Sequence, residues 1–253
     1  MRYLGKYSLY LPQNAYMMKK ILLLLAIILP FTLDSYSIEP VSPETHEWVD
    51  LGLPSGTLWA TCNVGANSPE EYGDYFAWGE ISTKESYDYI TYKWYDLSKE
   101  GYLTKYSTRT DNGCPCNYHR AHANDGFIDG KVELEPEDDA ATMNWGPQWR
   151  MPTQAQQYEL LWKCTWNWAQ MNGVNGYLVI GPNGKTIFLP AAGKRFGKRG
   201  ENVGSDGRYW SCEQFTGYSH YAYDISFNKY HAQGDHTFRS DGFSVRPVRA
   251  AQN

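Results

Sequence analysis

Apolar and polar residues alternate between residues 49 and 64, and several other short runs rich in aromatic and β-branched residues stand between turn residues. These patterns predict β-strands. The candidate strands, which include one aromatic run, are residues 57–61, 72–79, 208–211, 221–228 and 242–248. Two further runs, 176–180 and 185–190, flank the turn sequence Gly181-Pro182-Asn183-Gly184. We therefore expect these two runs to form a β-hairpin.

The segment 137–168 predicts two short helices. Asp138 and Asp139 are acidic residues at a helix start, residues 140–144 can form one or two turns, and Gly146 and Pro147 then end the helix.

The second helix is expected at 154–163, with Thr153 as its N-cap, because Pro152 prevents a helix from continuing back through Arg150. Three of its residues fall at i, i+3 and i+4, and we expect their shared face to enter a core: Tyr158, Leu161 and Trp162.

Structural roles are assigned to Trp145, Trp149, Trp162 and the hairpin around Asn183. Arg150 is expected to bridge the two helices and the sheet through its five N–H donors.

The first 37 residues are interpreted as a signal peptide, with residues 1–16 upstream of the true start. Lys19 and Lys20 form a short basic region, and the apolar run 21–29 is too short to span a bilayer. The alternative is a buried or anchoring N-terminal helix. We expect an exported protein (periplasmic, cell-surface or extracellular), with a tether at 38–46, one domain at 47–250 and no transmembrane segment in the mature chain.

The expected elements together favour an α+β domain of antiparallel strands with two short helices and long loops. The chain has 10 Trp and 21 Tyr, and residues 81–131 show weak periodicity. Removing residues 1–37 takes four basic residues and one acidic residue from totals of 23 and 28, which changes the net charge from −5 to −8. A surface of this charge does not indicate nucleic-acid binding, which normally needs a basic patch.

Five blocks of the sequence form a recognisable series: residues 47–60, 137–146, 149–153, 187–193 and 242–248. In this order they resemble the Fibrobacter succinogenes major paralogous domain, which is common in secreted proteins of Bacteroides-like bacteria. This resemblance implies a C-type-lectin-like fold, distantly related to the formylglycine-generating enzymes, which carry an Arg-Leu-Pro-Thr similar to the Arg150-Met151-Pro152-Thr153 found here. The family's function is poorly defined, so the resemblance implies more about fold than about activity.

The sequence does not decide which cysteines form disulfides. The chain has five cysteines, and an odd number leaves at least one thiol unpaired or in an intermolecular bond. They are Cys62, Cys114, Cys116, Cys164 and Cys212. Formylglycine-generating relatives use a cysteine pair late in the chain, whereas only Cys212 follows Cys164 here. That activity is therefore not carried over, and with no Gly-x-Ser-x-Gly elbow or phosphate-binding loop we expect no enzyme.

Metal binding has only weak candidates. His119 and His122, near Asp125 and Asp129, are read as a solvated loop in preference to a metal site. The turn sequences 111–113 and 124–126 could present oxygen ligands, so calcium is the one candidate cofactor. The acidic run 133–139 is read as a helix start and a solvated face, not as a catalytic carboxylate set.

The C-terminal stretch 209–241 is rich in Tyr, Ser, His, Asp and Asn among Gly turns, and we expect its loops to present a ligand face. The plain alternative is a polar loop region without a ligand. The candidate contact residues are Tyr218, His220, Tyr221, Tyr223, Asp224, Asn228, Tyr230, His231 and His236.

The sequence thus predicts a secreted or cell-surface ligand-binding protein, similar to an adhesin or receptor, whose ligand is a carbohydrate or a surface protein. Domains resembling this one are also targets of diversity-generating retroelements, and the composition is compatible with that. One alternative is a structural envelope or accessory protein without a ligand, and another is a divergent enzyme of the formylglycine-generating type.

Overall fold

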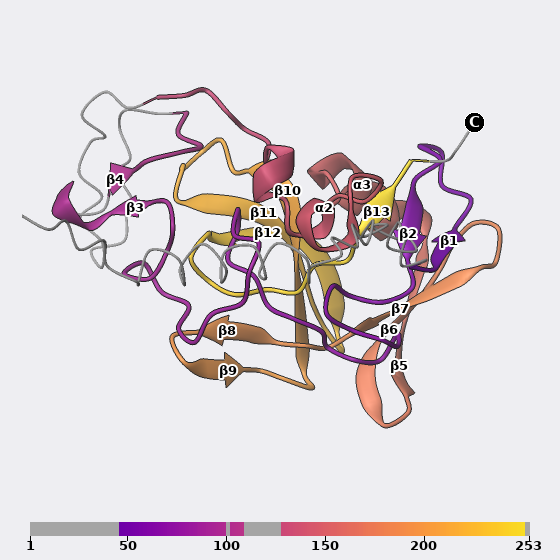
Figure 1. Cartoon of the computed structure of the whole chain (residues 1–253). Coiled ribbons are helices and arrows are strands. Elements are labelled where there is room, and N and C mark those ends of the chain that lie inside the picture. Colours follow the sequence, from indigo (N-terminus) through magenta and orange to yellow (C-terminus); the bar gives the residue numbers. More distant parts are fainter. Residues whose placement is uncertain (1–45, 100–101, 109–127, 251–253) are drawn as a thin grey trace, which may run out of the picture. The chain divides into compact units, whose positions relative to one another are not determined.

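Short antiparallel strands dominate the structure, a computed structural model that describes residues 46–99, 102–108 and 128–250 (Figure 1). Three sheets have three strands each. They are β1 (Trp48–Asp50), β2 (Leu58–Ala60) and β13 (Val248–Arg249); β5 (Thr165–Met171), β6 (Val174–Ile180) and β7 (Thr186–Pro190); and β10 (Asp206–Gln214), β11 (Tyr221–Asn228) and β12 (His231–Phe238).

Two smaller ribbons and a few helices complete the described part. The ribbons are β3 (Tyr95–Asp96) with β4 (Tyr102–Leu103), and β8 (Lys194–Phe196) with β9 (Arg199–Glu201). The helices are α2 (Ala140–Trp145), α3 (Gln154–Lys163) and the 3-10 turns η1 (Leu97–Lys99) and η2 (Pro136–Asp138). The α+β class with antiparallel strands is therefore confirmed. Among the described helices, none is both long and apolar enough to cross a bilayer.

Both predicted helices form. Thr153 is the N-cap of α3 as predicted, and the N-cap of α2 is Asp139, one of the two acidic residues expected at its start. The Asp139 carboxylate accepts the backbone N–H of Thr142 at 2.9 Å, and Gly146 ends α2. At α3, Thr153 and Gln156 form a capping box in which each side chain accepts the other residue's backbone N–H. These local bonds satisfy N–H groups that a helix start otherwise leaves open.

The buried face of α3 differs from the prediction. Leu160 and Gln157 are buried, Tyr158 and Leu161 are half-buried, and Trp162 is 73% exposed. Gln157 lies inside because its side-chain amide donates to the Tyr209 carbonyl at 3.0 Å, which compensates for its desolvation. The expectation that Trp162 enters a core is therefore wrong.

The predicted hairpin is confirmed as β6 and β7, closed by Gly181 N–H donating to the Lys185 carbonyl at 2.8 Å. The Asn183 side chain donates to the Asp50 carbonyl at 2.8 Å and so holds the turn against β1. These contacts agree with the structural role assigned to this hairpin.

The region 206–238 is a three-stranded sheet, in which β10 and β11 contain the predicted strands 208–211 and 221–228. The stretch that was expected to present a ligand face from its loops therefore consists mainly of strands. Strand β11 has the predicted bounds, and β12, which was not predicted as a strand, pairs with it along its whole length. By contrast, the aromatic run 72–79 makes only an isolated bridge, from Phe76 to Phe243, because Gly73 and Gly79 adopt positive φ and turn the backbone.

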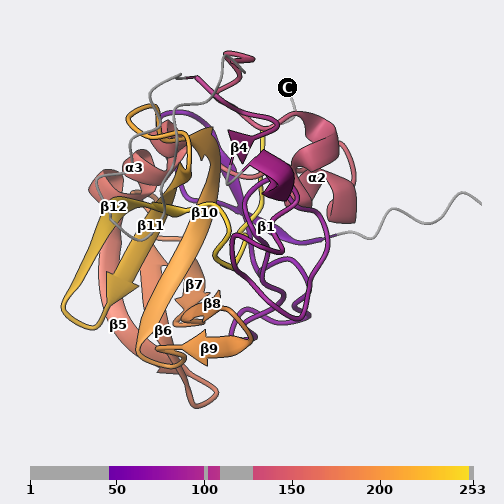
Figure 2. The same cartoon turned by 90° about the vertical axis from the view of Figure 1, so that its left-hand side faces the viewer.

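Apolar residues on both sides of the β10–β12 sheet belong to core clusters, and Figure 2 shows the three strands of this sheet side by side. Ile225 and Phe227 pack with Leu160 of α3 and with Tyr177 of β6. Cys212 and Ala222 belong to a second cluster, which includes Phe243. Helix α3 therefore packs on the face of the sheet that carries Ile225 and Phe227.

Two buried arginines connect segments far apart in sequence. Arg246 donates to Asn63 Oδ1 and to the carbonyls of Ala60, Thr61 and Phe188 at 2.8–3.1 Å. Arg239 lies over the Trp78 ring and donates to the Tyr92 hydroxyl and to three carbonyls.

Arg150 does not have the bridging role that was expected of it. Among the described residues, its guanidinium donates a hydrogen bond to the carbonyl of its neighbour Met151, at 2.9 Å. Only its backbone links distant parts, by pairing with Val248. Arg239 and Arg246 link distant segments instead, but their bonds go to strands and loops and not to α2 or α3.

Candidate functional site

Six aromatic side chains gather at one end of the β10–β12 sheet. Tyr221 pairs with Phe238 and Tyr223 with His236 in the β11–β12 register, so all four lie on one face. Phe215 follows β10, and Tyr218 lies in the β10–β11 connection. We call this set, residues Phe215, Tyr218, Tyr221, Tyr223, His236 and Phe238, the aromatic cluster.

The rings of the aromatic cluster contact one another in defined geometries. Phe215 stacks on His236 with ring centroids 3.9 Å apart, and Tyr223 meets Phe215 edge to face at 5.3 Å. Tyr221 stacks on Phe238 at 4.5 Å. Tyr218 and His236 are exposed and the other four rings are half-buried. Such contacts fix the ring orientations, which leaves a preformed aromatic surface.

Asp224 lies on the opposite face of β11, because side chains alternate along a strand. It is buried, and its carboxylate accepts from Arg208 at 3.2 Å and from the Thr237 hydroxyl at 2.8 Å. Burial raises the pKa of Asp224 to about 7, against the opposing effect of the Arg208 guanidinium. These contacts give Asp224 a structural position apart from the aromatic cluster.

His220 is also buried, with its Nδ1 2.8 Å from the Tyr95 hydroxyl. Its backbone carbonyl accepts the N–H of Arg239 at 3.0 Å. The His220 side chain therefore supports the sheet end from inside.

Three predicted residues lie at the far end of the β11–β12 hairpin: Asn228, Tyr230 and His231. Five residues of extended strand separate Tyr223 from Asn228, or about 16 Å. The Asn228 side chain accepts the Tyr230 N–H at 2.9 Å within the turn, and the Tyr230 ring is 80% exposed. The structure therefore brings together four of the nine candidates: Tyr218, Tyr221, Tyr223 and His236.

Sequence reasoning missed two members of the aromatic cluster, Phe215 and Phe238. The candidates were polar and tyrosine side chains of an expected loop, whereas this segment forms a strand, in which every second residue lies on the same face. In the run from 231 to 238, the positions Ala232, Gly234, His236 and Phe238 share one face. Reading that face would have placed Phe238 beside His236.

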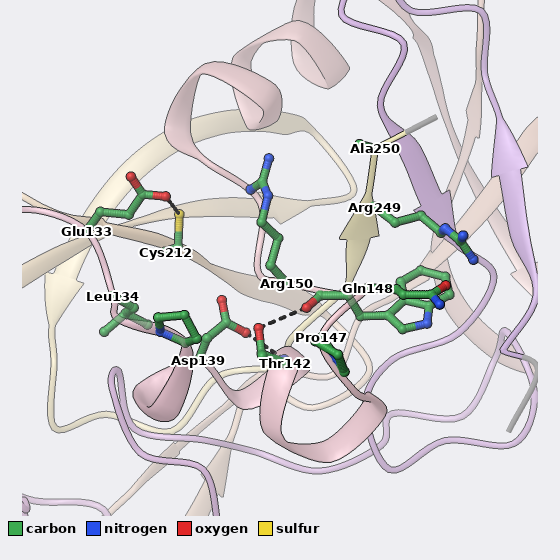
Figure 3. A pocket seen from close by; sticks show the side chains of 12 residues that line it. Glu133, Leu134, Asp139, Thr142, Pro147, Gln148, Arg150, Cys212, Arg249 and Ala250 are labelled. Atoms are coloured by element: carbon green, nitrogen blue, oxygen red, sulfur yellow. Dashed lines mark hydrogen bonds between the residues drawn. The ribbon is translucent and has the colours of Figure 1, made fainter. Parts of the chain in front are cut away.

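A cavity of about 530 Å³ lies elsewhere, between η2, α2 and β13 (Figure 3). Its lining includes the cations Arg150 and Arg249 and the carboxylates of Glu133 and Asp139. Both Asp139 oxygens are engaged by backbone N–H groups, those of Thr142 and Met151. The lining therefore carries charges of both signs.

Cys212 lines the same cavity, and its thiol lies 3.5 Å from a Glu133 carboxylate oxygen (Figure 3). The residue is 2% exposed. Burial raises the pKa of the Cys212 thiol well above its ordinary value, and the nearby Glu133 carboxylate adds to the shift. A thiol in this setting is a poor nucleophile, because the thiolate is the reactive form.

The three cysteines within the described ranges, Cys62, Cys164 and Cys212, carry free thiols. Cys114 and Cys116 lie outside those ranges, as do the proposed signal peptide and residues 38–45 of the tether.

Most of the metal candidates also lie outside the described residues: His119, His122, Asp125 and both turn sequences. Asp129 is described, and its carboxylate accepts the backbone N–H groups of Tyr106, Ser107 and Lys131. Across the described ranges, no group of three or more His, Cys, Asp or Glu side chains is placed to hold a metal ion.

No model of a protein family matches this chain, and neither a curated protein nor a solved structure matches it. The resemblance to the major paralogous domain family therefore stays a prediction, and function has to be argued from the geometry of the site.

Proposed function

We propose that this protein is an exported, non-catalytic ligand-binding protein of the cell surface or the extracellular space. The observation that carries this proposal is the aromatic cluster, in which Phe215, Tyr223 and His236 hold one another in place at a sheet end. Preformed sites with aromatic walls and a few polar groups are typical of ligand binding. Export is supported by the basic and apolar pattern of residues 17–37.

The ligand is a carbohydrate or a surface protein. Aromatic ring faces contact the apolar C–H surface of a sugar, while tyrosine hydroxyls and an imidazole at the ring edges form hydrogen bonds. The same residue types are common where one protein recognises another, because tyrosine provides a large contact area at a low entropic cost.

A C-type-lectin-like fold for residues 47–250 belongs to the same proposal. It is supported by the sequence blocks named above and by the antiparallel strands, two short helices and long irregular segments of the described part. The absence of catalysis is supported by Cys212, whose buried thiol is unsuited to the chemistry of a formylglycine-generating enzyme.

The test is a binding screen of the purified chain, residues 38–253, against glycans and surface proteins, in calcium and again in chelator. We expect saturable binding that is lost in the double variant Tyr223→Ala, His236→Ala. Tyr230→Ala is the matched control, because this tyrosine is exposed but lies at the other end of the hairpin. Loss of binding in chelator alone would show that calcium is a cofactor.

Two results would refute the proposal. A folded, monodisperse protein that binds nothing in either screen would favour a structural envelope role, and self-assembly in solution would strengthen that conclusion. Equal binding by the double variant and by Tyr230→Ala would instead place the site elsewhere.

The proposal extends to a diversified receptor. In that case a reverse-transcriptase gene and an imperfect repeat of the last part of the coding sequence lie beside this gene, and sister copies differ at the codons of Tyr221, Tyr223 and His236. Invariant codons at these positions among sister copies would exclude diversification.

A further inference from the structure

The aromatic surface continues from the aromatic cluster onto helix α3. Tyr158 lies directly on Gly234 of β12, since a Cβ built on this glycine would come within 2.2 Å of the Tyr158 ring. Gly234 shares its strand face with His236, two residues further along β12. Glycine at this position lets the tyrosine approach the strand backbone next to the aromatic cluster.

One helical turn beyond Tyr158, the Trp162 indole stacks on the tyrosine ring, with centroids 4.8 Å apart and planes 6° from parallel. The indole is 73% exposed, so Tyr158 covers one of its faces and the other is open. Gln154 fixes the tyrosine by donating to its hydroxyl at 3.1 Å. We call the aromatic cluster together with Tyr158 and Trp162 the aromatic ladder.

The aromatic ladder is long compared with one sugar ring. A path along it has three steps. Two steps cover two strand residues each, from Tyr221 to Tyr223 and from His236 to Gly234. The third covers four helix residues, from Tyr158 to Trp162. These steps add up to about 20 Å. Two stacked pairs, Phe215 with His236 and Tyr158 with Trp162, stand at different points along it.

The chemistry of the aromatic ladder indicates an uncharged occupant. Its members are four Tyr, two Phe, one Trp and one His, whose rings offer stacking faces and hydrogen-bonding edges. Two neighbouring carboxylates are already engaged: Glu213 accepts the backbone N–H of Gln154 at the start of α3, and Asp235 accepts the backbone N–H of His236 and pairs with Arg208. A charged ligand would lose its hydration here without gaining an ion pair, whereas stacking on an uncharged ring has no such cost.

We propose that the aromatic ladder binds a linear, uncharged polysaccharide, with successive sugar rings of one chain contacting the Phe215–His236 pair and the Tyr158–Trp162 pair. This inference rests on the proposed function and makes it more specific, because it names a ligand longer than a single sugar. Affinity should therefore increase with chain length until both pairs are occupied.

The experiment measures dissociation constants for uncharged β-1,4-linked oligosaccharides of glucose, mannose and xylose, from disaccharide to hexasaccharide, by calorimetry. For the best series we expect the affinity to rise with length in the natural protein. Trp162→Ala should weaken hexasaccharide binding about two- to tenfold, the effect of losing one aromatic contact, and should remove most of the increase with length. His236→Ala should act in the same way from the other end.

Trp48→Ala is the matched control, since Trp48 is also exposed but lies on β1, outside the aromatic ladder. Oligogalacturonate of the same lengths tests the role of charge and should bind more weakly than the uncharged series.

The outcomes separate this inference from the proposed function. Binding without length dependence, no effect of Trp162→Ala, or a preference for oligogalacturonate would overturn the inference and leave a smaller or charged ligand at the aromatic cluster. Binding of a surface protein but of no oligosaccharide would also overturn it while preserving the proposed function. No binding in any screen would refute both.

Discussion

Replacement of Arg246 should destabilise this protein more than almost any other single change. The side chain is fully buried and donates to four acceptors: Asn63 Oδ1 and the carbonyls of Ala60, Thr61 and Phe188. Arg246→Met keeps an apolar stem of similar length but removes every donor. Each buried acceptor left open costs at least about 1 kcal/mol, so we expect a loss of about 4 kcal/mol.

That loss is a large share of the roughly 5–15 kcal/mol that stabilises a typical domain. For a domain of this size it corresponds to a decrease in melting temperature of about 8–16 °C. Arg246→Lys should recover little, because one ammonium group cannot reach acceptors that are contacted by Nε, Nη1 and Nη2 separately.

The assay is urea unfolding followed by tryptophan fluorescence, with thermal melts as a second measurement. Arg199→Met is the control, because Arg199 is exposed on β9 and its side chain bonds to none of the residues that the structure describes. A difference of less than about 1 kcal/mol between the two methionine variants would refute the reasoning, since it would mean that water satisfies the four acceptors.

Two further predictions test packing and charge. Gly234→Ala should lower stability by about 1–3 kcal/mol in urea unfolding, because its Cβ would come within 2.2 Å of the Tyr158 ring. Gly200→Ala, whose nearest neighbour is a Val203 methyl at 3.2 Å, should cost clearly less, and equal costs would contradict the packing argument. Folding raises the pKa of Asp224 from 3.8 to about 7, so the folded state favours the protonated carboxyl. The resulting stabilisation is fully present below pH 3.8 and is lost as the pH rises to about 7. Unfolding of Asp224→Asn should therefore lack this part of the decrease in stability with rising pH, and parallel pH profiles for the variant and the natural protein would refute the assignment.

Local signals predicted local structure well. The helix start at Asp139, the N-cap Thr153 and the turn at 181–184 depend on side chains and backbone angles within a few residues, and all three formed as expected. Strand β11 was also predicted, because its alternation of residue types is regular.

The rest depended on partners that a sequence pattern does not reveal. The polar run His231–Phe238 becomes a strand because β11 offers it a full register, which overrides its weak strand propensity. Trp162 was placed in a core by its helical spacing, yet Gln157 and Leu160 are buried in its place because the Tyr209 carbonyl accepts the glutamine amide. The candidate site combined residues from both faces of β11, although Asp224 follows Tyr223 directly and so had to point the other way.

The sheet formed by β1, β2 and β13 has a consequence for how the chain folds. Strand β13 completes a sheet begun by β1 and β2, and Arg246 reaches an acceptor 186 positions earlier in the chain. Contacts this distant in sequence close long loops, and proteins rich in them fold in milliseconds to seconds, not microseconds. During synthesis, β2 therefore has no β13 to pair with until almost the whole domain has been made. Until then its edge is open to pairing with other chains, so this edge is where misfolding should begin.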